Sequence, residues 1–215
     1  MEPTVRPVGV LHKSITVLDA VAEQKRSLNE LVESTGLSRA TAHRIAQGLE
    51  EHGLLRRTDD GRFALGLHLL ALGRQAAEQY PLAERARPAM EQLRDSTGES
   101  VQLYVTDGTE RVCVAALESP HGLRTIVPVG AALPMDRGSA GHVLSAPQPE
   151  VVGDWVESVE EREAGVASVS APVFGPAGEV VAALSVSGPL DRMGPSPGGR
   201  HGAAVASAAV SISDS

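Results

Sequence analysis

Apolar residues near the start of the chain recur at three- and four-residue intervals, which is the period of an amphipathic helix. Leu11, Ile15, Leu18 and Ala22 follow this spacing and predict a helix over residues 13–24. A second apolar run of the same period follows within a few residues. The chain is therefore expected to open with consecutive short helices.

A capping box predicts the start of the second helix. Ser27 and Glu30 have the S-x-x-E spacing in which each side chain accepts a hydrogen bond from the other residue's backbone amide. Leu28 and Leu31 supply the buried face of this helix. Gly36 can adopt the left-handed conformation that ends a helix, so the sequence indicates both of its ends.

The third helix is expected to start after a turn of about three residues. Ser38 is placed to cap this helix and Gly53 to close it. Ala42, Ile45 and Leu49 recur at helical spacing and are expected to face inward. Two short amphipathic helices joined by a tight turn that contains glycine are typical of a helix-turn-helix.

The hydrophobic period changes after the third helix. Residues 54–57 and 62–65 are short runs joined by Thr58-Asp59-Asp60-Gly61, a turn sequence typical of a β-hairpin. Three helices followed by a hairpin predict a winged helix-turn-helix over residues 12–66. We expect residues 1–11 to form a flexible tail.

Hydrogen-bond donors cover the outward face of the third helix. The candidate DNA-binding residues of this helix are Ser38, Arg39, Thr41, His43, Arg44 and Gln47. In a helix-turn-helix, the start of the second helix reaches base edges, where arginine suits guanine and glutamine suits adenine. Hydroxyl groups and free amides at the helix start suit phosphate. Arg56, Arg57 and Arg62 on the hairpin are placed to contact the adjacent DNA backbone.

A second interpretation of the same arginines is a merely solvated helix surface. That interpretation is the simpler one for an isolated helix that carries Arg39 and Arg44. The preceding helix, the tight turn and the basic hairpin favour binding of double-stranded DNA instead.

The charge of the chain is distributed unevenly. Nine Lys/Arg and nine Asp/Glu balance in residues 1–66, whereas ten and eighteen in residues 67–215 produce the whole net charge of −8. An acidic second part would repel a polyanion, so we expect two modules with different partners. Aromatic residues make up 2% of the chain, which argues against stacking platforms for single-stranded nucleic acid.

Cysteine usage and hydropathy exclude further classes of protein. Cys113 is the only cysteine, which excludes an intrachain disulfide and a multi-cysteine metal site, and we expect a buried, inert thiol rather than a nucleophile. No apolar run approaches the roughly 20 residues that span a bilayer. The first residues lack a secretory signal pattern, so we expect a cytoplasmic protein without membrane contact, metal or cofactor.

Catalytic motifs are missing from the sequence. The run Gly138-Ser139-Ala140-Gly141 lacks the first glycine of the G-x-S-x-G nucleophile elbow, because Arg137 stands in its place. His142 is expected on the surface, and neither a phosphate-binding loop nor an H-E-x-x-H motif occurs. We therefore expect no enzyme. The same run predicts a short helix whose free amides could hold a carboxylate.

Residues 67–79 predict a helix that is too apolar for a solvated connector. Its apolar residues are Leu67, Leu69, Leu70, Leu72 and Ala76. Such a helix must be covered, either by its own chain or by a second subunit.

The remainder of the chain mixes helical and strand patterns, which predicts an α+β fold. Pro81 opens a helix in which Pro88 predicts a kink or break. Residues 101–105 and 111–117 predict two strands joined by a turn, and residues 199–212 predict a closing helix.

Residues 166–187 predict a hairpin that gathers hydroxyl groups on one face of a sheet. With a four-residue loop at residues 175–178, Phe174 pairs with Glu179. This register places two cross-strand pairs on one face, Ser168 with Ser185 and Val166 with Ser187. The face suits a small polar ligand held by neutral hydrogen bonds, and ordinary cross-strand serine pairing accounts for it equally well.

The run from Ile15 to Leu65 resembles the DNA-binding domain of the IclR family of bacterial transcription regulators. GLHLLALGRQAAE resembles the linker helix of that family. TGESVQLYVTDG, VPVGAALPMDRGSAGHVL and EREAGVASVSAPVFGPAGEVVAALSVSGP resemble its effector-binding domain, most closely the actinobacterial branch associated with amino-acid biosynthesis and secondary metabolism. The resemblance implies a transcription regulator of metabolic genes that responds to a small metabolite.

The resemblance also implies an architecture and partners. A linker and dimerisation helix over residues 67–80 would precede a GAF/profilin-like α/β domain with an antiparallel sheet over residues 81–215. A homodimer or tetramer would place its recognition helices on a near-palindromic operator. The competing class is a small-molecule sensor or vestigial enzyme domain without specific DNA binding.

The effector implied by the resemblance is a small organic acid or an amino-acid-related compound. The effector-binding residues carried over by motif are Thr125, Ser139, Ala140, Val166, Ser168, Ser185 and Ser187. Two features depart from the family. Ser158 replaces an acidic residue found in some members, and the stretch between Leu144 and Trp155 is shorter than usual.

Overall fold

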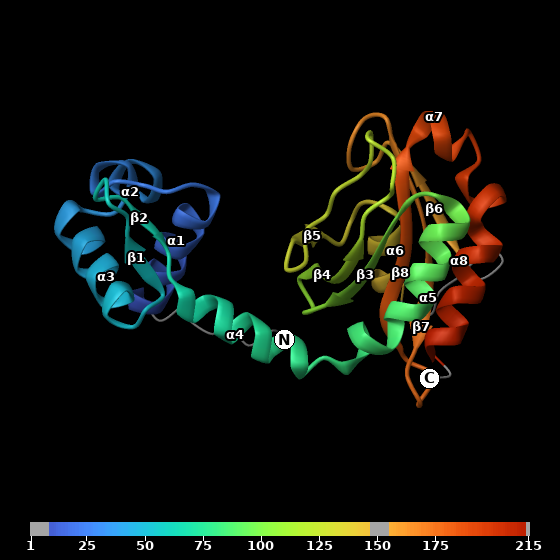
Figure 1. Cartoon of the computed structure of the whole chain (residues 1–215), viewed down its shortest axis with the longest axis horizontal. Coiled ribbons are helices and arrows are strands. Elements are labelled where there is room, and N and C mark those ends of the chain that lie inside the picture. Colours follow the sequence, from blue (N-terminus) through green and yellow to red (C-terminus); the bar gives the residue numbers. More distant parts are fainter. Residues whose placement is uncertain (1–8, 147–154, 214–215) are drawn as a thin grey trace. The chain divides into compact units, whose positions relative to one another are not determined.

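The computed structural model describes residues 9–146 and 155–213 (Figure 1). The chain divides into two compact units, residues 1–79 and residues 80–215. Each unit has a hydrophobic core of its own. The first unit combines helices with a two-stranded sheet and the second combines helices with a six-stranded sheet, which confirms the α+β class.

Three helices and a hairpin form the core of the N-terminal unit. In chain order the elements are α1 (Gly9–Glu23), α2 (Leu28–Thr35), α3 (Arg39–Glu51), β1 (Leu55–Arg57), β2 (Phe63–Leu65) and α4 (Leu67–Glu78). Val17, Leu31 and Phe63 are fully buried where the three helices meet the hairpin. β1 and β2 pair antiparallel, with Leu55 opposite Leu65, so the expected winged helix-turn-helix is confirmed.

α1 starts earlier than its buried face predicts. Residues 9–11 were expected in a flexible tail and are helical, whereas residues 1–8 lie outside the described residues. Val10 and Leu11 are 64% and 60% exposed. The predicted apolar series also marked the wrong face of this helix. Leu11, Ile15 and Ala22 are exposed, and the buried residues of α1 are Val17, Ala20 and Val21.

The expected caps on both sides of the helix-turn-helix turn are confirmed. The Ser27 amide donates to Glu30 Oε2 at 2.6 Å, and the Glu30 amide donates to Ser27 Oγ at 3.4 Å. Gly36 has a φ of 67° and ends α2 in the left-handed conformation. The Thr41 amide donates to Ser38 Oγ at 3.3 Å at the start of α3. The orientation of α3 is thus held by local hydrogen bonds that the sequence specifies.

α4 is a helix, as expected, but the N-terminal unit does not cover its apolar face. Leu67, Leu70 and Leu72 are 76%, 74% and 44% exposed. Burial against the rest of the N-terminal unit is therefore excluded for these leucines, and the choice between cover by the chain itself and cover by a second subunit stays a prediction. Exposed leucines at this spacing leave an apolar strip on the surface of the unit.

An antiparallel sheet of six strands forms the centre of the C-terminal unit. In chain order the elements are α5 (Pro81–Thr97), β3 (Ser100–Thr106), β4 (Glu110–Leu117), β5 (Ala132–Pro134), α6 (Ser139–Ser145), β6 (Val156–Val159), β7 (Val166–Phe174), β8 (Val180–Pro189), α7 (Leu190–Met193) and α8 (Pro197–Ser213). The strand order is β5-β4-β3-β8-β7-β6. α5 and α8 pack side by side on one face of the sheet, and α6 lies on the other face (Figure 1).

α5 runs through Pro88 as one continuous helix, so the break expected there is wrong. Pro88 lacks the amide that would bond to the carbonyl of Glu84 one turn earlier. Both residues are exposed, and water can take the place of the missing donor. The proline is tolerated because it lies on the solvent side, which the sequence period alone did not indicate.

The β7–β8 hairpin forms, but its register differs from the expected one. Phe174 pairs with Val180 instead of Glu179, and a bulge next to Phe174 shifts the pairing further. The observed pairs are Ser168 with Ser187, Ser170 with Ser185 and Val166 with Pro189. The expected pairs of Ser168 with Ser185 and Val166 with Ser187 are therefore wrong. The shift amounts to two residues, so each side chain keeps the predicted face of the sheet.

Candidate DNA-binding and effector-binding sites

α3 has one buried face and one polar face, as the sequence predicts. Ala42, Ile45 and Leu49 are 0%, 7% and 7% exposed and belong to the core of the N-terminal unit. Arg44 and Gln47 are exposed on the outward side. The helix therefore presents donors to solvent without using them to hold the fold.

The Arg44 side chain is not constrained by the rest of the N-terminal unit. It has no ion pair or hydrogen bond to any of the residues that the structure describes. Arg39 is also exposed, and its Nη1 donates to Asn29 Oδ1 of α2. That contact orients the Arg39 guanidinium and leaves its remaining donors for another partner.

The start of α3 offers fewer free groups than its sequence suggests. The hydroxyl groups of Ser38 and Thr41 bond to each other at 2.9 Å, and Ser38 Oγ also caps the helix. Thr41 and His43 are half-buried. Phosphate binding at this end would depend chiefly on the exposed amides of the first turn.

The hairpin arginines differ in how far they are engaged within the unit. The Arg57 guanidinium lies 4.3 Å from the centre of the Phe63 ring and 3.5 Å from the Glu50 carboxylate. Arg62 Nη1 lies 3.1 Å from the Glu30 carboxylate. Arg56 is exposed and has no such partner in the described part of the chain. Of the three, Arg56 is the residue best placed to reach a phosphate.

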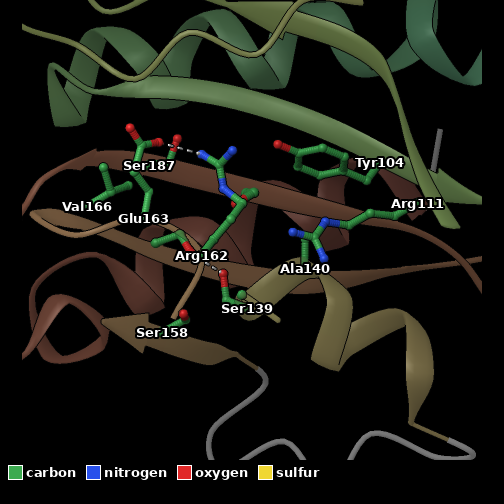
Figure 2. Close-up of a pocket in the computed structure, with 12 residues that line it drawn as sticks. Tyr104, Arg111, Ser139, Ala140, Ser158, Arg162, Glu163, Val166 and Ser187 are labelled. Atoms are coloured by element: carbon green, nitrogen blue, oxygen red, sulfur yellow. Dashed lines mark hydrogen bonds and ion pairs between the residues drawn. The ribbon is translucent and has the colours of Figure 1, made fainter. Parts of the chain in front are cut away.

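A pocket opens on the sheet face that carries α6 in the C-terminal unit (Figure 2). We call it the serine pocket, and its lining is Tyr104, Arg111, Gly138, Ser139, Ala140, Ser158, Arg162, Glu163, Val166, Ser168, Ser185 and Ser187. Six of the seven residues expected to bind an effector belong to this lining. Its volume of about 30 Å³ is room for roughly one or two water molecules.

The seventh expected residue, Thr125, does not line the serine pocket. Its carbonyl accepts a hydrogen bond from Ser100 Oγ at 2.7 Å, and its own hydroxyl is buried without a partner in the described chain. Thr125 belongs to the long connection between β4 and β5. Thr125 was assigned to the site by its motif alone, and the connection that carries Thr125 does not contribute to the pocket lining.

Hydrogen bonds join the serines that the sequence places on one face. Ser139 Oγ lies 2.7 Å from both Ser168 Oγ and Ser170 Oγ, which ties the start of α6 to β7. Ser187 Oγ donates to Gln102 Oε1 at 3.0 Å. These hydroxyl groups already bond to one another and to Gln102. They can donate to a ligand only if the hydrogen bonds within the protein break.

The start of α6 already holds a carboxylate from the same chain. The Gly138 amide donates to Glu161 Oε2 at 2.8 Å, and His142 Nε2 lies 2.7 Å from the same oxygen. Burial acts to raise the pKa of Glu161, but the Gly138 amide and His142 outweigh it, so the pKa lies below its usual value. The position expected to bind an effector carboxylate is thus filled by Glu161.

Arg111 is a buried cation that the sequence analysis did not single out. It is 3% exposed, its Nη1 donates to the carbonyl groups of Pro134 and Arg137, and its Nε has no hydrogen-bond partner in the described chain. Burial lowers the pKa of Arg111, and the Arg162 charge adds to that effect. An arginine at a buried position of an otherwise apolar strand was the signal in the sequence.

Arg162 and Tyr104 complete the lining on the side away from α6 (Figure 2). Arg162 lies in the connection between β6 and β7, and its side chain is 28% exposed. Burial raises the pKa of Tyr104, so its phenol stays protonated and can donate a hydrogen bond. Arg162 was missed because only the fold brings this connection over the serine face.

The remaining chemical expectations concern the thiol, metals and membranes. Cys113 is fully buried, and burial raises the pKa of its thiol to about 11, as expected for an inert group. Among the described residues, no cluster of three or more His, Cys, Asp or Glu side chains could hold a metal ion. Over the same residues, every helix is too short or too polar to cross a bilayer.

An exposed polar helix in a helix-turn-helix on one unit and a small pocket lined by hydroxyl and guanidinium groups on the other are the features of a DNA-binding regulator with a small-molecule domain. Comparison with known families identifies the chain further. The IclR helix-turn-helix domain matches residues 10–59, and the bacterial transcriptional regulator IclR C-terminal domain matches residues 74–158 and 151–214. The chain belongs to the IclR family of DNA-binding transcription regulators with a C-terminal effector-binding domain.

Three relatives illustrate the range of similarity. The HTH-type transcriptional regulator KipR of Bacillus subtilis is 31% identical over 68% of this chain and 59% of that protein. The glycerol operon regulatory protein of Streptomyces griseus is 29% identical over 88% of both chains. An IclR homologue from Microbacterium hydrocarbonoxydans, solved in complex with 4-hydroxybenzoate, covers 95% of this chain and 98% of its own with a TM-score of 0.78 and 24% identity. This last likeness confirms the fold.

Proposed function

We propose that this protein is a homodimeric transcription regulator whose affinity for a DNA operator changes when a small organic acid binds in the serine pocket. The observation that carries the proposal is a pair of unfilled sites. Arg44 on the outward face of α3 has no partner within the described chain, and Arg111 is a buried cation without an acidic partner there. A free basic helix suits DNA, and a buried, unpaired cation suits an anion.

The DNA-binding surface consists of the exposed side of α3 and the neighbouring hairpin. Arg39, Arg44 and Gln47 face outward and would enter the major groove. Arg56 would contact phosphate. Asp59 and Asp60 at the hairpin tip would keep that tip away from the duplex, since both carry the charge of phosphate.

The dimer would form through the apolar strip of α4. Leu67, Leu70 and Leu72 are exposed on this helix, and a second copy of the same helix offers the same strip. Two α3 helices joined in this way would read two half-sites of a near-palindromic operator. We place such a regulator in the cytoplasm, without catalytic activity.

The effector acts through its different affinities for two arrangements of the dimer. A carboxylate that pairs with Arg111 would also exchange hydrogen bonds with the serines that link α6 to β7. That exchange gives the acid a means to shift the position of α6. The 4-hydroxybenzoate in the homologue's structure is an acid of this kind.

The experiment is an anisotropy titration of the full-length protein against a labelled duplex from upstream of its own gene, over a series of salt concentrations. The expected result is sequence-specific binding whose affinity falls steeply with salt and changes when simple carboxylic acids are added. A random duplex of equal length is the control. Equal affinity for both duplexes at every salt concentration would refute the proposal.

A further inference from the structure

Two guanidinium groups line the serine pocket from different parts of the fold. Arg111 comes from β4, and Arg162 comes from the connection between β6 and β7 (Figure 2). Burial is the main cause of the lowered pKa of Arg111, and the positive charge of Arg162 adds to it. Like charges brought together in a small cavity cost free energy unless an anion lies between them.

The acidic groups near the pocket do not neutralise this pair. The Glu163 carboxylate lies 3.8 Å from Arg162, at the edge of ion-pair distance, and is 65% exposed. Glu161 is held by the Gly138 amide and His142. Asp136 is 73% exposed and lies 3.5 Å from Arg137. Glu161 and Asp136 act on Arg111 only as weaker, more distant charges.

Resting on the proposed function, we infer that the effector of the serine pocket is a dicarboxylic acid, with one carboxylate held by Arg111 and the other by Arg162. The Arg111 guanidinium is fixed by the Pro134 and Arg137 carbonyl groups, which orients it toward one carboxylate. The hydroxyl groups that line the pocket together with the two arginines suit the polar atoms of a short, acid-terminated chain. A single carboxylate on Arg111 would leave Arg162 with only its long ion pair to the exposed Glu163.

The small volume of the pocket requires a lining side chain to move before an acid can bind, and Arg162 is the side chain that can do so. A volume of about 30 Å³ does not admit a dicarboxylate, so a lining side chain must move. Arg162 is 28% exposed and its ion pair with Glu163 is long, whereas Arg111 is buried and its Nη1 donates to two backbone carbonyl groups. We expect the Arg162 side chain to swing outward while the acid enters. It would then exchange its ion pair with Glu163 for one with the effector carboxylate and cover the bound acid.

Calorimetry on the full-length protein tests this inference with acids matched in chain length. The pairs are succinate with butyrate and glutarate with pentanoate, and inorganic phosphate is a further probe. We expect each diacid to bind at least tenfold more tightly than its matched monoacid. Arg162→Gln should abolish this preference while monoacid binding remains, and Arg162→Lys should keep part of it because the charge remains.

Arg137→Gln is the matched control, because Arg137 is 59% exposed and its side chain is not part of the pocket lining. It should leave the diacid preference unchanged. Equal affinity for the members of each pair, or a preference that survives Arg162→Gln, would overturn the inference and leave the proposed function standing. Tighter binding of phosphate than of either diacid would overturn it in favour of a compact anion. Failure of every acid to bind would overturn the proposed effector class and this inference together.

Discussion

Replacement of Arg44 by alanine separates recognition of DNA from stability of the fold. Arg44 is exposed on α3 and contacts none of the described residues through an ion pair or hydrogen bond. Alanine is the strongest helix former, so the helix itself loses nothing. The free energy of unfolding should therefore change by less than about 0.5 kcal/mol, as is usual for an exposed site.

The effect on DNA binding should be far larger than the effect on folding. An arginine that pairs with the edge of a guanine contributes about 1–3 kcal/mol for each half-site. Two α3 helices on one operator would double this to about 2–6 kcal/mol, which corresponds to a loss of roughly 30-fold to 10⁴-fold in affinity. Affinity for a random duplex should fall much less, because base contacts carry the specificity.

Arg57→Ala is the contrasting variant for this experiment. Arg57 lies 4.3 Å from the centre of the Phe63 ring and 3.5 Å from the Glu50 carboxylate, and its Nη1 donates to the Gly61 carbonyl at 3.1 Å. An exposed cation–π contact and a surface ion pair each contribute up to about 1 kcal/mol. This variant should be destabilised by about 1 kcal/mol and should lose less operator specificity than Arg44→Ala.

Anisotropy titrations with operator and random duplexes, together with urea unfolding of each variant, measure both quantities. The reasoning would be refuted by an Arg44→Ala protein that keeps the operator preference of the parent. It would also be refuted if Arg44→Ala lowered the free energy of unfolding as much as Arg57→Ala, since Arg44 would then hold the fold.

Three further changes test the other surfaces. The double variant Ser185→Val, Ser187→Val should abolish the response to acids in calorimetry and leave operator binding intact; normal acid binding would exclude this face. Leu70→Asp should convert the dimer to a monomer in sedimentation and weaken operator binding, whereas an unchanged mass would exclude the α4 strip. The lowered pKa of Glu161 means that its contribution to stability is complete above pH 4.5, its unperturbed value, and is lost as the pH falls further. Glu161→Gln should therefore flatten the decline in thermal stability below pH 4.5, and an identical decline would contradict the contact with Gly138 and His142.

Local sequence signals predicted the order of the elements in the N-terminal unit and the caps beside its tight turn, but not the buried face of α1. The Ser27–Glu30 capping box, the left-handed Gly36 and the Ser38 cap all depend on residues within one or two turns of each other. The buried face of α3 was predicted from apolar residues that recur with the helical period of 3.6, and the polar residues between them form its exposed face. The apolar period that begins at Leu11 did not coincide with the residues that α1 buries, because its first turn is exposed.

The serine face was predicted, but its register was not. Alternation along β7 and β8, combined with the parity of the assumed hairpin register, assigned Ser168 and Ser185 to one face from the sequence. The pairing across the hairpin depends on a bulge next to Phe174, which the loop sequence did not specify. The register error was two residues, so the hairpin residues Val166, Ser168, Ser185 and Ser187 kept the expected face and only their cross-strand partners changed.

The sequence by itself determined the caps, the helix faces and the alternation of the strands, because each of these depends on residues that are neighbours along the chain. Only the tertiary structure decided the charge of the pocket. Arg111 lies in a strand, Arg162 in a later connection, and Glu161 reaches back to the start of α6. Electrostatic free energy depends on distances through space and on burial, and both are fixed only when segments far apart in the sequence pack together.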